Sequence, residues 1–218
     1  MSAQENPMES SKIAEYLLKI KAVQLRLDPP FTWSSGWKSP IYCDNRLSLS
    51  YPEVRNFVRD SFVHQVRERY PEATAIAGVA TGAIALGALV ANAMDLPMVY
   101  IRSKAKGHGM AKLVEGKLDP EGKYVVIEDL VSTGKSSVKA VKALQDEGAT
   151  VLGTLAIFSY GFPVAEAAFS ETGTPFHSLT NLSELLQKAT EINYLQPESQ
   201  ATIMDWQKDP ELWQNTLS

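Results

Sequence analysis

The segment Val125–Ser137 reads VVIEDLVSTGKSS, and this stretch decides the fold. Its first three residues are apolar, which is typical of a strand that is buried on both faces. Two acids follow, then a short loop of hydroxyl residues with one glycine, and a helix is predicted from Lys135 to Asp146. A buried strand that passes through a small polar loop into a helix is the unit of a parallel α/β sheet.

Other apolar runs repeat this pattern on both sides of the segment. Strands are predicted at residues 75–79, 98–101 and 150–158, and an Ala- and Leu-rich helix is predicted at 83–94. Because crossovers between parallel strands are right-handed, residues 70–165 are expected to form a doubly wound, mainly parallel α/β sheet.

The rest of the chain is predicted to pack around this core. Helices are expected over Ser10–Val23 and from Ser50 onward, where Ser50 and Glu53 have the spacing of a capping box. The aromatic, turn-rich stretch Phe31–Tyr42 indicates a hairpin or an extended hood. The expected single domain, residues 1–218, thus comprises an N-terminal helix and hood (1–45), the α/β core (70–165) and short C-terminal helices (175–218).

The loop after the two acids is suited to binding a sugar phosphate. Ligands bind beyond the carboxyl ends of such strands, and the backbone N–H groups of Ser132 to Ser136 would face an anion at the helix N-terminus. Gly134 lets the backbone approach closely. Carboxylates accept hydrogen bonds from a vicinal diol, so Glu128 and Asp129 would hold the 2- and 3-hydroxyls of a ribose 5-phosphate.

Three other interpretations of this segment compete. The run Gly134-Lys135-Ser136 resembles the end of a nucleotide P-loop, but that motif needs glycine where Asp129 stands. A glycosidase acid pair is disfavoured because neighbouring side chains of a strand point in opposite directions. The third interpretation is a strand that ends in a polar turn and binds nothing. It is disfavoured because it does not account for the combination of two acids, a Ser-Thr-Gly loop and a helix.

A second polar segment, Arg102–Gly109, follows the strand at 98–101. Its basic residues are Arg102, Lys104, Lys106 and His108. They alternate with small residues, so an extended chain would present all four on one side. This is the composition of a cationic lid that closes over a polyanion. The alternatives are a solvated charged loop and a nucleic-acid site, and the second is disfavoured because no aromatic residues are interleaved.

Composition narrows the class of protein. The 218 residues carry a net charge of −4, which disfavours a general nucleic-acid binder. The single cysteine, Cys43, excludes an internal disulfide and a multi-cysteine metal site. No stretch approaches the roughly 20 apolar residues that cross a membrane, and the polar start does not read as a secretory signal. We therefore expect a cytoplasmic protein without membrane or nucleic-acid partners.

The phosphate loop, the lid and the hood together resemble a known family. Residues Glu128–Ser136 resemble the phosphoribosyl pyrophosphate (PRPP) motif of the type I phosphoribosyltransferases. The lid, with its Lys106-Gly107-His108-Gly109 ending, and the hood Phe31–Tyr42 are similar to those of the orotate phosphoribosyltransferases in particular. The resemblance runs from about Ile13 to Phe158, and more loosely to Pro210.

The resemblance implies a fold, a reaction and a set of site residues. The family transfers ribose 5-phosphate from PRPP to N1 of orotate, giving orotidine 5′-monophosphate and pyrophosphate in pyrimidine synthesis. It uses Mg²⁺, expected on the pyrophosphate and the ribose hydroxyls, and it forms a homodimer in which each lid serves the neighbouring site. Catalytic roles are implied for Arg102, Lys106 and His108, and substrate contacts for Lys38, Lys104, Glu128, Asp129, Leu130, Val131, Ser132, Thr133, Gly134, Lys135 and Ser136.

Three positions depart from the family pattern. Ser103 stands where many relatives have Lys, so Lys104 is expected to substitute for it. Thr81-Gly82 replace a Tyr-Lys pair, so backbone N–H groups or other cations must hold the pyrophosphate. Tyr160 stands where some relatives place an Arg for the orotate carboxylate. Two alternative functions stay open: transfer to another base, and a PRPP-sensing regulator on the same fold.

Overall fold

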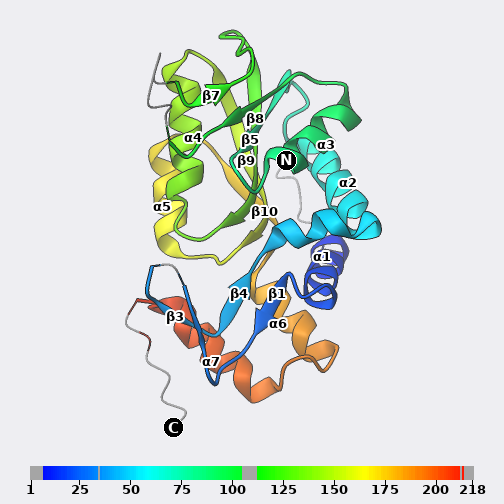
Figure 1. The fold of residues 1–218 in the computed structure, drawn as a ribbon, viewed down its shortest axis with the longest axis vertical. Helices are drawn as coiled ribbons and strands as arrows, with labels where there is room; N and C mark the ends of the chain where they lie inside the picture. Colours follow the sequence, from blue (N-terminus) through cyan, green and yellow to red (C-terminus); the bar gives the residue numbers. More distant parts are fainter. Residues whose placement is uncertain (1–6, 34, 105–111, 212, 214–218) are drawn as a thin grey trace.

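A six-stranded sheet with helices on both faces forms the centre of the computed structural model (Figure 1), which describes residues 7–33, 35–104, 112–211 and 213. The strand order is β10-β9-β8-β5-β6-β7, and neighbours are parallel except for β6 and β7. The bounds are Ala75–Val79 (β5), Met98–Ile101 (β6), Val114–Glu115 (β7), Lys123–Val131 (β8), Thr150–Ser159 (β9) and Phe176–Asn181 (β10). The predicted doubly wound, mainly parallel sheet is therefore confirmed.

Two layers of helices bury the two faces of this sheet, as Figure 1 shows. One layer contains α1 (Pro7–Lys19), α2 (Pro52–Arg69) and α3 (Ile84–Met94), and the other contains α4 (Lys135–Asp146) and α5 (Pro163–Glu171). The helices α6 (Leu182–Glu191) and α7 (Pro197–Lys208) follow β10 and lie beyond the end of the sheet. Ile76 and Ile127 share a hydrophobic cluster with α1, α2 and α3, whereas Ala77 and Val126 share another with α4. Because successive strand residues face opposite sides, only an apolar run fits between the two layers.

The chain between α1 and α2 forms a hood of two small antiparallel pairs. β1 (Val23–Leu25) pairs with β4 (Ile41–Cys43), and β2 (Phe31–Thr32) pairs with β3 (Lys38–Ser39), which confirms the predicted hairpin. The 3₁₀ helix η1 (Asn45–Ser50) then leads to α2. In Figure 1 the hood lies beside α6 and α7.

Contacts join the hood to the C-terminal helices. The indole Nε1 of Trp206 in α7 donates to the backbone oxygen of Lys38 at 3.1 Å. One cluster of buried apolar side chains includes residues from Ile13 to Trp206. From this shared core we propose that the chain forms one domain.

Three details of the secondary structure differ from the expectation. Helix α1 begins at Pro7, and Ser10 lies inside it with its hydroxyl donating to Thr180 Oγ1 at 3.1 Å. Helix α2 begins at Pro52 with Tyr51 as its N-cap and no side-chain cap, so the capping box does not form. The chain after Pro175 first forms strand β10, which was not predicted. It lies at the edge of the sheet, and its sequence mixes polar and apolar residues. None of the helices in the described part of the chain is long and apolar enough to span a membrane.

Candidate active site

The turn from β8 to α4 forms the predicted phosphate loop. The sequence predicts a strand that ends before the acids, whereas β8 continues to Val131 because its last residues pair with Phe158 and Ser159 of β9. Gly134 is the N-cap of α4 and has a φ of 76°, in the left-handed region that favours glycine. The first N–H groups of α4 have no partner within the helix, so they are available to an anion.

The two acids of this segment lie in different environments. Glu128 is buried, with Oε1 accepting from the backbone N–H of Asp129 at 3.0 Å and Oε2 accepting from Ser137 Oγ at 2.9 Å. Burial, followed by the hydrogen bond and the charge of Asp129, raises the pKa of the Glu128 carboxyl well above its ordinary value of 4.5. The two acids therefore interact with each other, and both residues line one cavity.

Asp129 is held in place by two other segments. The Asn45 Nδ2 of η1 donates to the backbone oxygen of Asp129 at 2.6 Å, and Cys43 Sγ donates to Asn45 Oδ1 at 3.2 Å. On the other side, a Cβ on Gly82 would lie 2.6 Å from Asp129 Oδ1. Only glycine at this position therefore leaves room for the carboxylate where the structure places it.

Two neighbouring cavities meet at this strand end. The first, of about 590 Å³ and here called the cradle cavity, lies between the phosphate loop and the hood; it is lined by Thr32, Trp33, Ser35, Trp37, Tyr42, Cys43, Leu130, Ser132, Thr133, Lys135 and Tyr160. The second, of about 410 Å³ and here called the acid-pair cavity, is lined by Cys43, Asp44, Arg46, Ala80, Thr81, Gly82, Glu128, Asp129, Leu130 and Ser136. Because Cys43 and Leu130 line both, one ligand could extend from one cavity into the other.

Aromatic rings form the hood side of the cradle cavity. The rings of Trp33 and Trp37 stack with centroids 6.3 Å apart, and Trp33 packs against Tyr160 at 5.1 Å. Trp33 is further fixed because its Nε1 donates to the Ile41 backbone oxygen at 3.0 Å. Both tryptophans therefore line the cavity, where flat rings suit a planar aromatic ligand.

The structure places the other predicted site residues less closely together. Lys38 Nζ donates to Thr32 Oγ1 at 2.8 Å, and Arg102 pairs with Glu115 Oε1 at 3.3 Å. Lys38, Arg102 and Lys104 are absent from the described linings of both cavities. Lys106 and His108 fall within 105–111, outside the described residues.

Several residues to which the sequence assigned no side-chain role line the site or position its acids. They include Asn45, Arg46, Cys43 and Gly82, the last of which the sequence placed only in the pyrophosphate loop. Gly82 carried a signal, because it follows the strand next to β8 and the carboxyl ends of parallel strands share one edge. Asn45 and Arg46 carried none, since they follow the hood rather than a strand of the central sheet.

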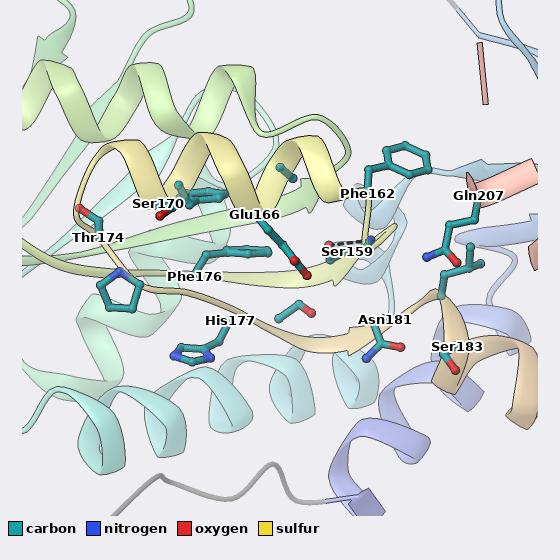
Figure 2. Close-up of a pocket in the computed structure, with 16 residues that line it drawn as sticks. Ser159, Phe162, Glu166, Ser170, Thr174, Phe176, His177, Asn181, Ser183 and Gln207 are labelled. Carbon is teal, nitrogen blue, oxygen red and sulfur yellow. Dashed lines mark hydrogen bonds between the residues drawn. The ribbon is translucent and has the colours of Figure 1, made fainter. Parts of the chain in front are cut away.

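A separate cavity of about 470 Å³ lies between α5 and β10, and Figure 2 shows Glu166 of α5 pointing into it. Ser159, His177 and Gln207 also line it. None of the phosphate-loop residues 128–136 belongs to its described lining. This cavity is therefore distinct from the site built around Asp129.

Comparison with known proteins agrees with this arrangement of strand, acids and phosphate loop. A family model, the phosphoribosyl transferase domain, matches residues 61–165, so this part of the chain has the fold of a phosphoribosyltransferase. An orotate phosphoribosyltransferase from Bacteroides thetaiotaomicron is 54% identical over 200 residues, covering 92% of this chain and 94% of that protein. One from Listeria innocua is 50% identical over 202 residues, covering 93% and 97%. The chain belongs to the orotate phosphoribosyltransferase family, and it is a transferase.

Solved structures show the same fold. The orotate phosphoribosyltransferase of Aeropyrum pernix superposes with a TM-score of 0.73 at 28% identity, covering 84% of this chain and 99% of that chain. The UMP synthase of Leishmania donovani gives a TM-score of 0.77 at 27% identity, covering 91% of this chain and 42% of that chain. The predicted type I phosphoribosyltransferase fold is thus confirmed.

Proposed function

We propose that the protein transfers ribose 5-phosphate from PRPP to N1 of orotate, releasing pyrophosphate and forming orotidine 5′-monophosphate. The observation that carries the proposal is the juxtaposition of three features at one strand end. A phosphate loop on the N-terminus of α4, a carboxylate from Asp129 and an aromatic wall from the hood border two adjoining cavities. These match the phosphate, the ribose diol and the planar base of one nucleotide.

Each part of the substrates has a proposed partner. The 5-phosphate binds the backbone N–H groups of Ser132 to Ser136, including those of Thr133, Gly134 and Lys135. The ribose hydroxyls donate to Asp129. Glu128 accepts a hydrogen bond from Ser137 and so links the end of β8 to α4. Orotate lies in the cradle cavity beside Trp33 and Tyr160, with Ser132 as a polar contact.

The residues present fit a magnesium ion that is held mainly by substrate. Among the described residues there is no group of three or more His, Cys, Asp or Glu side chains that could hold a metal. Mg²⁺ commonly binds through one or two carboxylates together with substrate oxygens, and the Asp129 carboxylate, which lines the acid-pair cavity, is such a donor. When bound, the ion would supply charge compensation for the pyrophosphate.

The proposed catalysis is mainly electrostatic. Cleavage at ribose C1 places positive charge on the sugar and additional negative charge on the departing pyrophosphate. Preorganised cations stabilise this leaving group, and closure over it excludes water that would hydrolyse PRPP. We assign this role to Lys106 and His108 of the lid, with Arg102 at its base and Lys104 in place of the cation missing at Ser103. Lys38 is proposed to reach the substrates from the hood.

The test is the reaction itself. Orotate, PRPP and Mg²⁺ are incubated with the protein, and the loss of orotate absorbance is followed, with uracil and adenine as competing bases. Consumption of orotate alone supports the proposal. Consumption of another base, or PRPP binding without transfer to any base, favours one of the two alternatives. Asp129→Asn should weaken PRPP binding, and Asp146→Asn, at an exposed position at the end of α4, is its matched control.

Two further expectations from the family stay predictions. The protein is expected to act as a homodimer whose lids serve the neighbouring subunits, and it is expected in the cytoplasm. Sedimentation of the purified protein tests the first. Mixing two impaired variants, Lys106→Ala and Asp129→Asn, tests lid sharing, because a mixed dimer regains one intact site only if the lid acts across subunits.

A further inference from the structure

The side chain of Arg46 is positioned by its neighbour Asp44 at the start of η1. Arg46 Nε lies 2.6 Å from Asp44 Oδ1, and Arg46 Nη2 lies 2.9 Å from Asp44 Oδ2. Such a two-point pairing fixes the plane of the guanidinium. The side chain remains 59% exposed, so it is oriented without being buried.

Arg46 is the single Lys or Arg among the described residues that line the acid-pair cavity. That cavity also contains the acids Asp44, Glu128 and Asp129, and the backbone of the loop after β5, Ala80–Gly82. This loop carries no cationic side chain. A polyanion that enters the cavity therefore meets carboxylates on one side and the Arg46 guanidinium on another.

The stereochemistry of PRPP places a polyanion here. PRPP is an α-ribosyl compound, so the pyrophosphate on C1 lies on the same face of the ring as the 2- and 3-hydroxyls. A ribose whose hydroxyls face Asp129 therefore directs its pyrophosphate toward the acid-pair cavity. The 5-phosphate stays at the phosphate loop on the opposite side of the ring.

We propose that Arg46 binds the pyrophosphate group of PRPP and stabilises it as the leaving group. A guanidinium has five N–H donors, and Asp44 accepts from two nitrogens of Arg46, so further donors remain for phosphate oxygens. Asp44 thus acts as a positioning residue. Arg46 supplies the side-chain cation that the loop Ala80–Gly82 lacks. This inference rests on the proposed function, since it assumes that PRPP is the substrate.

The test compares three ligands that differ in what they carry. Calorimetry with Mg²⁺ measures PRPP, free pyrophosphate and ribose 5-phosphate binding to wild type, Arg46→Gln and Arg46→Lys. Arg59→Gln is the matched control, because Arg59 also pairs with a neighbouring acid, Asp60, but lies in α2 outside both cavities. Arg46→Gln should bind PRPP and pyrophosphate on the order of tenfold more weakly, and Arg46→Lys should lose less. Ribose 5-phosphate binding and all values for Arg59→Gln should stay unchanged.

Two outcomes would overturn the inference. One is unchanged pyrophosphate affinity in Arg46→Gln, and the other is an equal loss for all three ligands, which would indicate general damage to the site. If Arg46→Gln does not fold, Arg46→Lys alone decides by the same comparison. Different results would refute the role of Arg46 and the proposed function. Wild type that binds pyrophosphate through Arg46 but does not consume orotate would refute only the function.

Discussion

Replacing Gly82 by alanine is expected to weaken PRPP binding by displacing the Asp129 carboxylate. The added Cβ would lie 2.6 Å from Asp129 Oδ1, far inside the roughly 3.5 Å at which non-bonded heavy atoms meet. Gly82 is not among the glycines at positive φ, so alanine is allowed by the backbone and the crowding acts alone. Because Asn45 holds the backbone oxygen of Asp129 at 2.6 Å, the free end of the side chain is the part that must move.

The expected magnitude follows from the contact that Asp129 would lose. A hydrogen bond from a ribose hydroxyl to a charged carboxylate contributes about 1.5–3 kcal/mol. At about 1.4 kcal/mol per factor of ten, PRPP affinity should fall about tenfold to a hundredfold. Orotidine 5′-monophosphate should lose a similar factor because it carries the same diol. Inorganic phosphate, which needs only the phosphate loop, should bind as in wild type.

Calorimetry on wild type, Gly82→Ala, Asp129→Asn and the double variant tests this reasoning. If Gly82 acts through Asp129, the double variant should lose no more PRPP affinity than the single variant that loses more. The reason is that the effects of substitutions at contacting residues do not add. Melting temperatures verify that each variant is folded. The coupling between Gly82 and Asp129 would be refuted if folded Gly82→Ala bound PRPP as tightly as wild type. It would also be refuted if the losses of the two single variants added in the double variant.

The remaining predictions concern the lid, the packing and the buried acid. Lys106→Ala should lower kcat about a hundredfold with an unchanged melting temperature, whereas Lys117→Ala should not change kcat; near-normal turnover would remove Lys106 from its role. Gly153→Ala should lower the free energy of unfolding in urea by about 1–3 kcal/mol, because its Cβ would collide with the Tyr70 ring. Tyr70→Phe should raise that free energy by about 1 kcal/mol, because the buried Tyr70 hydroxyl has no hydrogen-bond partner in the described residues; a loss would show an interaction the structure lacks. For Glu128, the pKa is raised in the folded state above its ordinary 4.5, so its contribution to stability is complete below that value and declines as the pH rises toward the raised pKa. The stability of wild type relative to Glu128→Gln, from urea unfolding in acid and neutral buffers, should therefore decrease with pH, and a difference that is flat or grows would contradict the sign.

The phosphate loop could be predicted from sequence because its information is local. Val125–Ile127 is uniformly apolar, and the left-handed turn needs a glycine where Gly134 stands. The extent of β8 could not be predicted, since its last pairs depend on the register with β9. Strand β10 was missed for a related reason: it lies at the sheet edge, where burial no longer requires a continuous apolar run.

The rest of the site depends on contacts between segments that are far apart in the chain. Asn45 reaches the backbone of Asp129 across 84 residues, and only the docking of the hood creates that contact. Local pattern analysis has no access to it, because neither Asn45 nor Arg46 belongs to a periodic element of the sheet. The surroundings of Glu128 depend on another segment in the same way, since Ser137 in α4 donates a hydrogen bond to its carboxyl.

The cation for the pyrophosphate is therefore identified from the residues that line the cavity, and not from the loop in which the sequence motif would place it. The loop Ala80–Gly82 contributes backbone and space but no cation, and at Gly82 the space is needed for the Asp129 carboxylate. In this structure a side chain at position 82 would enter the volume that the Asp129 carboxylate occupies. The hood borders the cavity from another direction, where Arg46 can present a guanidinium that Asp44 has already oriented. The loop can then retain its glycine because the cation comes from a different segment of the fold.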